Sequence, residues 1–210
     1  MSSKPEYGAR VLRSQPAAEA WKRVCVRPVR TLDDLHKAFA VRTLVYMGEQ
    51  SCPFEEEFDG NDFAATHLIA EIDDRPVATL RMRWFAGFAK LERVCIVHSA
   101  RGQSVVQVLV AHAFEIASRK GYRRMIAQIQ TRLWRMWENV MDCQLRPGRA
   151  QFSFSDYHYT EIDIALPAHP LRLTRDSNPY EIIRPEGSWD EPGVLETSAG
   201  GQHHDTDVAA

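Results

Sequence analysis

Residues 91–106, LERVCIVHSARGQSVV, combine a β-prone run, a short polar loop and the start of an amphipathic helix. The first turn of a helix leaves backbone N–H groups without intrahelical acceptors, and the helix dipole places partial positive charge there. Gly102 allows the backbone to approach a ligand closely, and Arg101 adds a positive charge beside the loop. Because a phosphate is held by such donors and charge, the segment predicts an anion-binding site.

Glu92 is the residue of this stretch best suited to acid–base chemistry. It lies on the run that leads into the anion site, where a carboxylate can take a proton from an amine directly or through one water. An alternative interpretation is structural, because Glu92 neighbours Arg93 and is expected to pair with Arg81 on the adjacent strand. Both interpretations stay open, and His98, just beyond the run, is the second candidate base.

An acidic loop, broken by proline and glycine, precedes this stretch in the chain. Carboxylates facing a substrate would attract a cationic amine. Carboxylates facing solvent would instead cap local turns. The loop residues that carry this charge are Glu49, Glu55, Glu56, Glu57, Asp59 and Asp62.

Hydrophobic spacing predicts the elements that position these residues. Thr31 with Asp34 marks a helix start, and apolar residues recur at helical spacing from there toward Tyr46. Residues 105–120 carry an apolar helical stripe and meet Gly121, which is typical of a helix C-terminus. A further helix is expected from Thr131 to about residue 142. Strands are predicted at residues 21–28, 67–72, 77–85, 91–97, 124–130, 152–154 and 162–166.

The order of these elements predicts the fold class. The strand 91–97, the helix 105–120 and the strand 124–130 form a βαβ unit, whose two strands must be parallel. The strands 67–72 and 77–85 flank a four-residue turn and form an antiparallel hairpin. We therefore expect an α/β (α+β) fold with a mixed, mainly antiparallel twisted sheet, a central parallel βαβ unit and flanking helices.

Composition and charge exclude several classes of function. The 210 residues carry 26 basic and 28 acidic side chains, a formal net charge of −2, which disfavours a general nucleic-acid binder. The four cysteines form no CxxC pair, so no metal site is expected. The chain also lacks an apolar segment suited to a membrane span or signal core, and we expect a cytoplasmic protein that does not bind membranes.

Composition also divides the chain into four expected segments. Residues 1–20 show no periodicity and are expected to be a flexible leader. Residues 21–166 contain the predicted elements and form the main domain. Residues 167–196 form a proline-rich arm, with five of the chain's 11 prolines between Pro167 and Pro192. Residues 197–210 are small and polar and are expected to be a disordered tail.

The predicted anion loop resembles the pyrophosphate loop of the GNAT superfamily of acyl-CoA-dependent N-acyltransferases. That loop reads Arg/Gln-x-x-Gly-x-Gly/Ala between a strand and a helix, and here it reads RGQSVV from Arg101 to Val106. Further landmarks occur in the family's order over roughly residues 21–166. They are VRTLVYMGEQ at 41–50, Phe58-Asp59 with Asp62, His67, Leu80-Arg81, LERV at 91–94 and Ala127-Gln128.

The resemblance implies a GNAT fold, an activity and a set of site residues. The co-substrate would be acetyl-CoA or another acyl-CoA, with no metal, and the acyl group would pass directly to a small-molecule amine, a cationic one if the acidic loop faces it. Backbone groups of Val94 and Ile96 would bind pantetheine and the thioester, and the protein would be a monomer or a homodimer. The backbone amides that would bind the pyrophosphate are those of Arg101, Gly102, Gln103, Ser104, Val105 and Val106.

Three positions depart from the family pattern. Ser104 replaces a glycine, and we expect its hydroxyl to cap the helix or donate to phosphate. Val106 replaces a glycine or alanine, and its branched side chain is expected to weaken acyl-CoA binding. Trp137 stands where many relatives carry a tyrosine that protonates the departing thiolate. Water, Tyr157 or Tyr159 would have to supply that proton, or the role is absent.

Two other functions remain in competition with this one. Arg42, the acidic loop, Arg81 and Glu92-Arg93 resemble residues of the acyl-homoserine lactone synthases, which are GNAT-fold relatives that acylate S-adenosylmethionine. The usual tryptophan before the acidic loop is missing here. A third function is a module that binds acyl-CoA or a partner without turnover, which Val106 and Trp137 favour.

Overall fold

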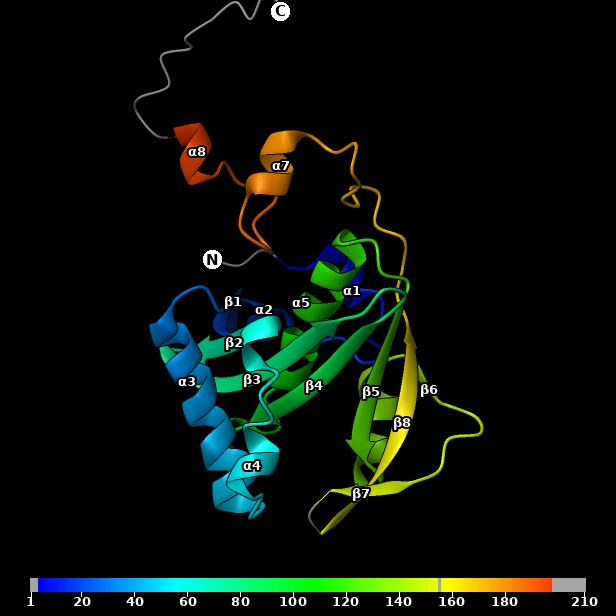
Figure 1. Ribbon diagram of the computed structural model, residues 1–210. Helices are drawn as coiled ribbons and strands as arrows, with labels where there is room; N and C mark the ends of the chain where they lie inside the picture. Colours follow the sequence, from blue (N-terminus) through cyan, green and yellow to red (C-terminus); the bar gives the residue numbers. More distant parts are fainter. Residues whose placement is uncertain (1–3, 155, 198–210) are drawn as a thin grey trace, which may run out of the picture. The chain divides into compact units, whose positions relative to one another are not determined.

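The computed structural model describes residues 4–154 and 156–197, within which eight strands form one sheet. The strands follow the order β1-β2-β3-β4-β5-β8-β6, and β7 also pairs with β8 (Figure 1). Only β4 and β5 pair in parallel, and the other pairs are antiparallel. The strands are β1 Cys25–Pro28, β2 Thr66–Ile72, β3 Arg75–Trp84, β4 Ala89–Ile96, β5 Arg124–Gln130, β6 Cys143–Leu145, β7 Phe152–Phe154 and β8 Tyr157–Ala165.

The expected α/β fold class is confirmed, because β4, α5 and β5 form the parallel βαβ unit. Helix α5 contributes buried residues along most of its length, as an apolar stripe on a central helix requires. The helices up to residue 172 are α1 Glu6–Ala9, α2 Ala18–Arg23, α3 Leu32–Arg42, π-helical η1 Thr43–Glu49, α4 Phe54–Glu57, η2 Asp62–Ala64, η3 His98–Ala100, α5 Val105–Arg119, η4 Thr131–Leu133 and α6 Trp134–Val140.

Strands β4 and β5 separate soon after they meet. Only Ala89–Leu91 pair with Met125–Ala127, whereas β4 continues to Ile96 and β5 to Gln130. Figure 1 shows the two strands side by side at their beginnings and diverging toward their carboxyl ends. Backbone groups beyond Leu91 on the side facing β5 therefore have no strand partner in this ladder.

A β-bulge bends β4 at the point of separation. Thr79 and Arg81 on β3 oppose Cys95 and Glu92 on β4, so two steps along one strand match three along the other. Arg93 takes up the extra residue with a φ of 52°, a left-handed conformation that is uncommon outside glycine.

The predicted helix start at Thr31 has the expected geometry. The Thr31 hydroxyl accepts a hydrogen bond from the Asp34 backbone N–H at 3.1 Å, and α3 begins at the next residue. The helical spacing continues past Arg42, but the chain changes there into the π-helix η1. Because π-helical turns are rare and occur frequently at functional sites, η1 is of interest beside the diverging strands.

Residues 4–20, expected as a flexible leader, instead form packed structure. Val11 and Leu12 are buried, and the Gly8 N–H donates to Glu115 Oε2 on α5 at 2.7 Å. The expected strand at residues 21–28 is likewise shortened to β1, because residues 18–23 form α2. Helices of four and six residues are too short to show a periodic signal, so the sequence pattern did not reveal them.

The chain divides into two units, of which the first comprises Met1–Arg172 and the second Leu173–Ala210. Within the second unit, α7 Pro179–Ile183 and α8 Val194–Thr197 interrupt the segment expected to be an extended arm. Asn178 caps α7, and Arg184 pairs with Glu196 at 2.6 Å. Of the expected tail 197–210, residues 198–210 lie outside the described part of the chain.

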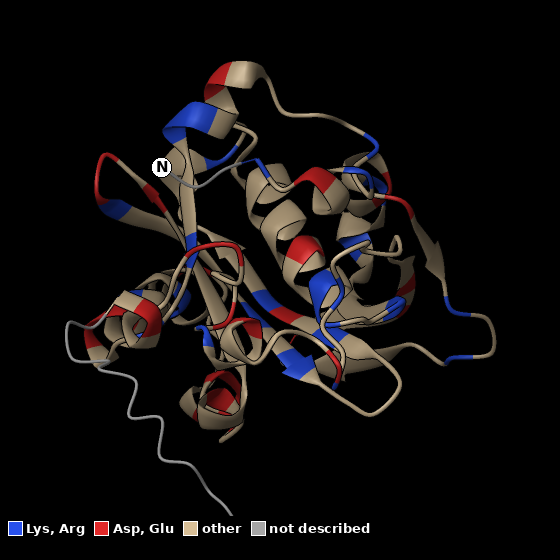
Figure 2. Ribbon diagram, turned by 90° about the horizontal axis from the view of Figure 1, so that it is seen from above, with Lys and Arg blue, Asp and Glu red and all other residues tan. Residues whose placement is uncertain are grey.

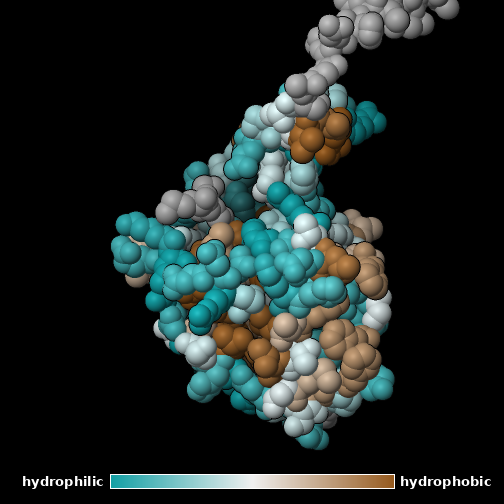
Figure 3. All heavy atoms as spheres, turned by 90° about the vertical axis from the view of Figure 1, so that its left-hand side faces the viewer, coloured by the Kyte–Doolittle hydropathy of each residue, from teal (hydrophilic) through white to brown (hydrophobic). Residues whose placement is uncertain are grey.

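The surface of α3, η1 and the following loop carries exposed apolar side chains among charged ones, including Leu44, Phe54 and Phe63. Figure 3, which faces this side of the molecule, shows apolar areas within a hydrophilic surface. Among the described residues, none of the helices has both the length and the apolar character needed to cross a membrane.

Candidate functional site

Two cavities lie where β4 and β5 separate. The larger has a volume of about 280 Å³ and is lined by residues of η1, the acidic loop, β3, β4, β5, β7 and β8. The smaller, about 90 Å³, shares Glu92 and Arg93 with it and reaches Val94, Gln130 and Trp137. A ligand in these cavities would contact both diverging strands, as expected for a site beyond the carboxyl ends of parallel strands.

A buried network of ion pairs forms the wall between α3, β3 and the larger cavity. Arg42 is 0% exposed and pairs with Glu57 and with Asp62, the latter at 2.5 Å. Arg81 is 1% exposed and pairs with Asp59 at 2.7 Å, Asp62 at 2.9 Å and Glu92 at 2.6 Å. Buried charges are retained only when they are paired in this way, so the network fixes the position of each side chain.

Arg93 joins the same network from the bulge. Its Nε lies 3.2 Å from Glu57 Oε2, its Nη2 lies 3.3 Å from Asp59 Oδ2, and it also donates to the backbone carbonyl of Glu56. In Figure 2, positive and negative segments alternate along a central strand of the sheet. Glu57, Asp59 and Asp62 are therefore paired with arginines and do not simply face solvent, although Asp59 Oδ1 also accepts from the Asn61 N–H, as the turn-cap interpretation expects.

The network changes the pKa values of its carboxyl groups in opposite directions. Burial alone would raise the pKa of Glu92, but the hydrogen bond from Lys90 and the charge of Arg81 outweigh it and lower this pKa. Burial is likewise outweighed at Asp59 and Asp62, whose pKa values are lowered by Arg81 and Arg42 respectively. Burial dominates at Glu57, whose pKa is raised. Glu92 is therefore ionised at neutral pH.

The predicted anion loop leads from β4 to the N-terminus of α5. Gly102 has a φ of 75°, and a Cβ placed there would meet no described atom within 4 Å, so the backbone is open to a ligand. Ser104 has a φ of 60° and makes no capping hydrogen bond within the described part of α5, so the expected helix cap is absent. The N–H groups of the first turn of this 15-residue helix remain available to an anion.

The Arg101 side chain is less available to bind an anion than the sequence implied, because it already has partners within the protein. Its guanidinium pairs with Glu49, donates to the Ile96 carbonyl at 3.2 Å and lies 3.3 Å from His98 Nδ1. Gln103, the next polar residue of the loop, donates to the Ser99 carbonyl at 2.8 Å. Both side chains therefore hold the loop in shape through hydrogen bonds to the backbone of the loop and of the end of β4.

The unpaired side of β4 presents the backbone groups expected to bind the thioester arm. The Val97 N–H donates to the Val77 carbonyl on β3 at 2.9 Å, so Val94 and Ile96, which alternate with it, direct their backbone groups away from β3. The Val94 carbonyl accepts a hydrogen bond from the Tyr46 hydroxyl at 2.9 Å. Val94 lines the smaller cavity, and Ile96 lies two residues farther along β4 toward the anion loop.

Tyr46 is a site residue that sequence reasoning missed. It contributes to both cavities, and burial raises the pKa of its hydroxyl well above the ordinary value. The sequence pattern only showed helical spacing running toward it, and the π-helix η1, which lets its hydroxyl reach β4, left no recognised signal. Tyr159, which was a candidate proton donor, also lines both cavities, with Gln130 Nε2 3.4 Å from its hydroxyl.

Among residues 4–154 and 156–197, no three His, Cys, Asp or Glu side chains are grouped as the ligands of a metal ion would be. His67, another landmark of the family resemblance, is buried with Nε2 3.0 Å from the Asp62 carbonyl, and burial lowers its pKa. It contacts the ion network and does not line either of the two cavities.

Comparisons with known proteins agree with this geometry. The GNAT acetyltransferase family matches residues 32–141. The Bacillus subtilis (strain 168) protein BSU40680, whose name describes it as an acetyltransferase, is 32% identical over 118 residues, covering 55% of this chain and 80% of the relative. An acyl-CoA N-acyltransferase structure from Pseudomonas aeruginosa superposes with a TM-score of 0.61 at 24% identity, covering 68% of this chain and 99% of that one.

A CoA-dependent acyl-homoserine lactone synthase, BjaI, shares the fold with a TM-score of 0.58 at 14% identity, covering 69% of this chain and 84% of its own. The family match spans more than half of the 210 residues and includes the ion network, β4, the anion loop, α5 and β5. The chain belongs to the GNAT acetyltransferase family.

Proposed function

We propose that this protein transfers an acyl group, acetyl in the first instance, from acyl-CoA directly to the amine of a small-molecule acceptor. The observation that carries the proposal is the divergence of β4 from β5, with cavities on one side of Val94 and the N-terminus of α5 on the other. A cofactor with a diphosphate at one end and a thioester at the other fits this arrangement. The backbone amides of residues 101–106 would bind its diphosphate.

The reaction follows from the groups along β4. The amine nitrogen would attack the thioester carbonyl, negative charge would grow on the carbonyl oxygen, and the backbone N–H of Val94 would stabilise it. The carbon–sulfur bond then breaks, and the thiolate takes a proton from water or from Tyr159. Glu92, ionised at the cavity wall, would accept the proton of the amine directly or through one water.

Release of free thiol from acetyl-CoA, followed with a panel of amines, tests the proposal. Turnover that depends on an added amine is the expected result. Binding of CoA without any turnover would favour the alternative of a binding module. Gly102→Ala is a matched loop variant, because it constrains the backbone at a φ of 75° without adding a contact.

Val106 allows a direct test of the anion loop. Its branched side chain stands in the first turn of α5, where the family has glycine or alanine. We expect Val106→Ala to bind CoA several-fold more tightly in calorimetry, because the nucleotide gains space at the helix N-terminus. Val194→Ala, in the second unit, is the control for loss of a valine side chain. Unchanged or weaker binding by Val106→Ala would remove the crowding argument.

A second candidate function is acylation of S-adenosylmethionine, as acyl-homoserine lactone synthases perform. It is favoured by one observation, the assembly of Arg42, Asp62, Arg81 and Glu92 into one network, since these are residues that carry the resemblance. Thiol release from a medium-chain acyl-CoA that requires S-adenosylmethionine, with lactone detected by mass spectrometry, would support it. Turnover with simple amines and none with S-adenosylmethionine would exclude it.

A further inference from the structure

The charged side chains around the larger cavity separate into those that are fully paired and those that are not. Arg81 hydrogen-bonds to Asp59, Asp62 and Glu92. Arg93 donates to the Glu56 carbonyl and lies within ion-pair distance of Glu57 and Asp59, although its Nε makes no hydrogen bond to a described residue. Arg83 and Lys90 also line the cavity, but both approach the same atom, Glu92 Oε1. One carboxylate group thus serves three cations: Arg81, Arg83 and Lys90.

The geometry of these contacts leaves positive charge facing the cavity. Lys90 Nζ lies 2.7 Å from Glu92 Oε1, whereas Arg83 Nη1 stays at 3.8 Å, beyond hydrogen-bonding distance. The side chains of Arg83 and Lys90 are 28% and 19% exposed, so neither is sealed into the core. The guanidinium of Arg83 lies 5.1 Å from the Phe85 ring centre, which limits its motion.

The total charge of the lining argues against a polycationic acceptor. Four cations, Arg81, Arg83, Lys90 and Arg93, face four carboxylates, Glu56, Glu57, Asp59 and Glu92. A polyamine would require an excess of carboxylates, and there is none here. A molecule with one positive and one negative group matches a lining whose charges balance but are spatially separated.

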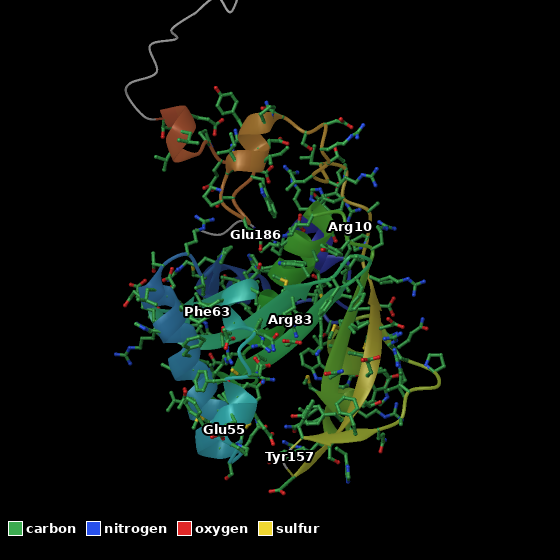
Figure 4. All side chains as sticks on the ribbon, in the orientation of Figure 1. Arg10, Glu55, Phe63, Arg83, Tyr157 and Glu186 are labelled. Carbon is green, nitrogen blue, oxygen red and sulfur yellow. The ribbon has the colours of Figure 1, made fainter. Side chains whose placement is uncertain are left out.

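The opposite wall of the cavity is aromatic. Phe154 and Tyr159 meet edge to face with ring centres 5.2 Å apart, and Tyr157 lines the cavity beside them. Phe154 is 48% exposed, so its ring is accessible from the cavity. Figure 4 labels Arg83 on β3 and Tyr157 on β8, the two sides from which the charged and aromatic walls come.

We propose that the acceptor amine carries a carboxylate and an apolar body, as an aromatic α-amino acid does, with Arg83 and Lys90 binding the carboxylate and the aromatic wall binding the body. This inference rests on the proposed acyl transfer and names the acceptor class for the same cavity. Arginine binds a carboxylate through two parallel N–H donors, and Lys90 adds a point charge beside it.

Paired substrates test the carboxylate directly. Phenylalanine, phenylalaninamide and phenethylamine share the ring and the amine, and only the first carries the carboxylate. With acetyl-CoA at saturation, we expect kcat/KM for phenylalanine to exceed that for each of the other two by at least about tenfold. Equal values for the acid and the amide, or faster turnover of spermidine, would overturn the assignment while leaving acyl transfer intact.

Variants assign the effect to the two cations. Arg83→Met should raise the KM for phenylalanine by about tenfold or more, with the KM for acetyl-CoA unchanged and little effect on phenylalaninamide. Lys90→Met also removes a hydrogen bond from Glu92, so we expect it to lower kcat for both substrates and, in addition, to reduce the preference for the acid over the amide. Arg75→Met is the matched control, because Arg75 is an exposed arginine at the other end of the same strand. Equal losses for the acid and the amide would contradict a carboxylate site.

A binding measurement separates this inference from the proposed function. Calorimetry with N-acetylphenylalanine and its amide, the products of the two reactions, requires no turnover. Tighter binding of the acid by the native protein, lost in Arg83→Met, would support the carboxylate site even if no thiol release is detected. Equal binding of acid and amide would overturn it, whether or not the enzyme turns over other amines.

Discussion

Glu92 has two roles that the same geometry imposes. Its oxygens bind Arg81 on one side and Lys90 on the other, so it holds the cations of the cavity wall in place. Its pKa is lowered, so it is ionised at neutral pH but holds a proton weakly. A carboxylate with a lowered pKa releases a proton readily. Glu92 is therefore suited to accept the amine proton through one water and then pass it to solvent.

Replacing Glu92 separates the two roles. Glu92→Gln keeps the shape and one acceptor for Arg81 but cannot take a proton, so we expect kcat to fall by about 100-fold with the KM for acetyl-CoA unchanged. Asp59→Asn is the matched control, since it also removes a negative charge that Arg81 faces. The Asp59→Asn variant should lower the melting temperature but leave kcat nearly unchanged. Equal losses of kcat in both variants would mean that Glu92 has only a structural role and does not act as the base.

The residues of the site were predictable to different degrees. Glu92 was expected to face Arg81, and the strand register pairs these two residues. Arg42 lies far from them in the chain, and no local pattern showed that Asp62 would join it to Arg81. Tyr46, Arg83 and Lys90 were not singled out as site residues, because their roles depend on strand divergence and on a shared carboxylate rather than on spacing.

At the scale of the elements, the loop before α5 keeps a left-handed backbone conformation at Ser104, although serine does not favour it as glycine does. Ser104 occupies the left-handed region with a φ of 60°, where the family usually has glycine. A side chain there costs about 1–2 kcal/mol, and no capping hydrogen bond within the described part of α5 offsets it. The loop therefore keeps its shape for a reason other than local preference, consistent with a ligand site.

Ser104→Gly should relieve this strain. We expect the free energy of unfolding to rise by about 0.5–1 kcal/mol, because the strain relieved exceeds the extra chain entropy of glycine. CoA affinity should not fall, since on our proposal the backbone N–H groups, and not the Ser104 side chain, bind the diphosphate. Urea denaturation and calorimetry measure the two quantities, with Ser104→Ala as the control for the hydroxyl. Weaker CoA binding by both variants would mean that the hydroxyl contacts phosphate.

The close packing of helix α1 against α5 allows a test of whether the N-terminal segment is part of the fold. Gly8 packs so closely on α5 that a Cβ there would lie 1.8 Å from the Ala111 carbonyl oxygen. Gly8→Ala must displace α1 and should lower the free energy of unfolding by about 1–3 kcal/mol in urea denaturation. Gly87→Ala, where a Cβ would meet no described atom within 4 Å, is the control and should change stability little. A stable Gly8→Ala protein would show that the segment is not part of the fold.

At the scale of the whole molecule, long periodic elements were predicted well and most short ones were not, with β7 Phe152–Phe154 as a short strand that was predicted. The strand at residues 124–130 and the helix beginning at Val105 match β5 and α5, because seven or more residues of regular spacing define them. The four-residue α1 and three-residue β6 have no such spacing, and only contacts with α5 and β8 define them. The fold class survived these omissions because the βαβ unit fixes the centre of the sheet.

The ion network also sets how the molecule responds to acid. Asp59, Asp62 and Glu92 have pKa values below those of an unfolded chain, which are about 4. Below that range the unfolded state binds more protons, so stability falls as the pH decreases through the folded-state values. Glu57, whose pKa is raised, changes the pH dependence of stability in the opposite direction, but it is a single group, whereas three carboxyl groups have lowered pKa values.

Asp59→Asn measures the contribution of this network to acid stability. At pH 7 the variant should melt several degrees below the native protein, because Arg81 and Arg93 lose an ionised partner. The difference should shrink as the pH falls below about 4, because Asp59 in the unfolded native chain then takes up a proton while the lowered pKa of folded Asp59 keeps it ionised. Asp33→Asn, at an exposed carboxylate on α3, is the control. A difference for Asp59→Asn that stays constant from pH 7 to pH 3 would contradict an ionised, paired Asp59.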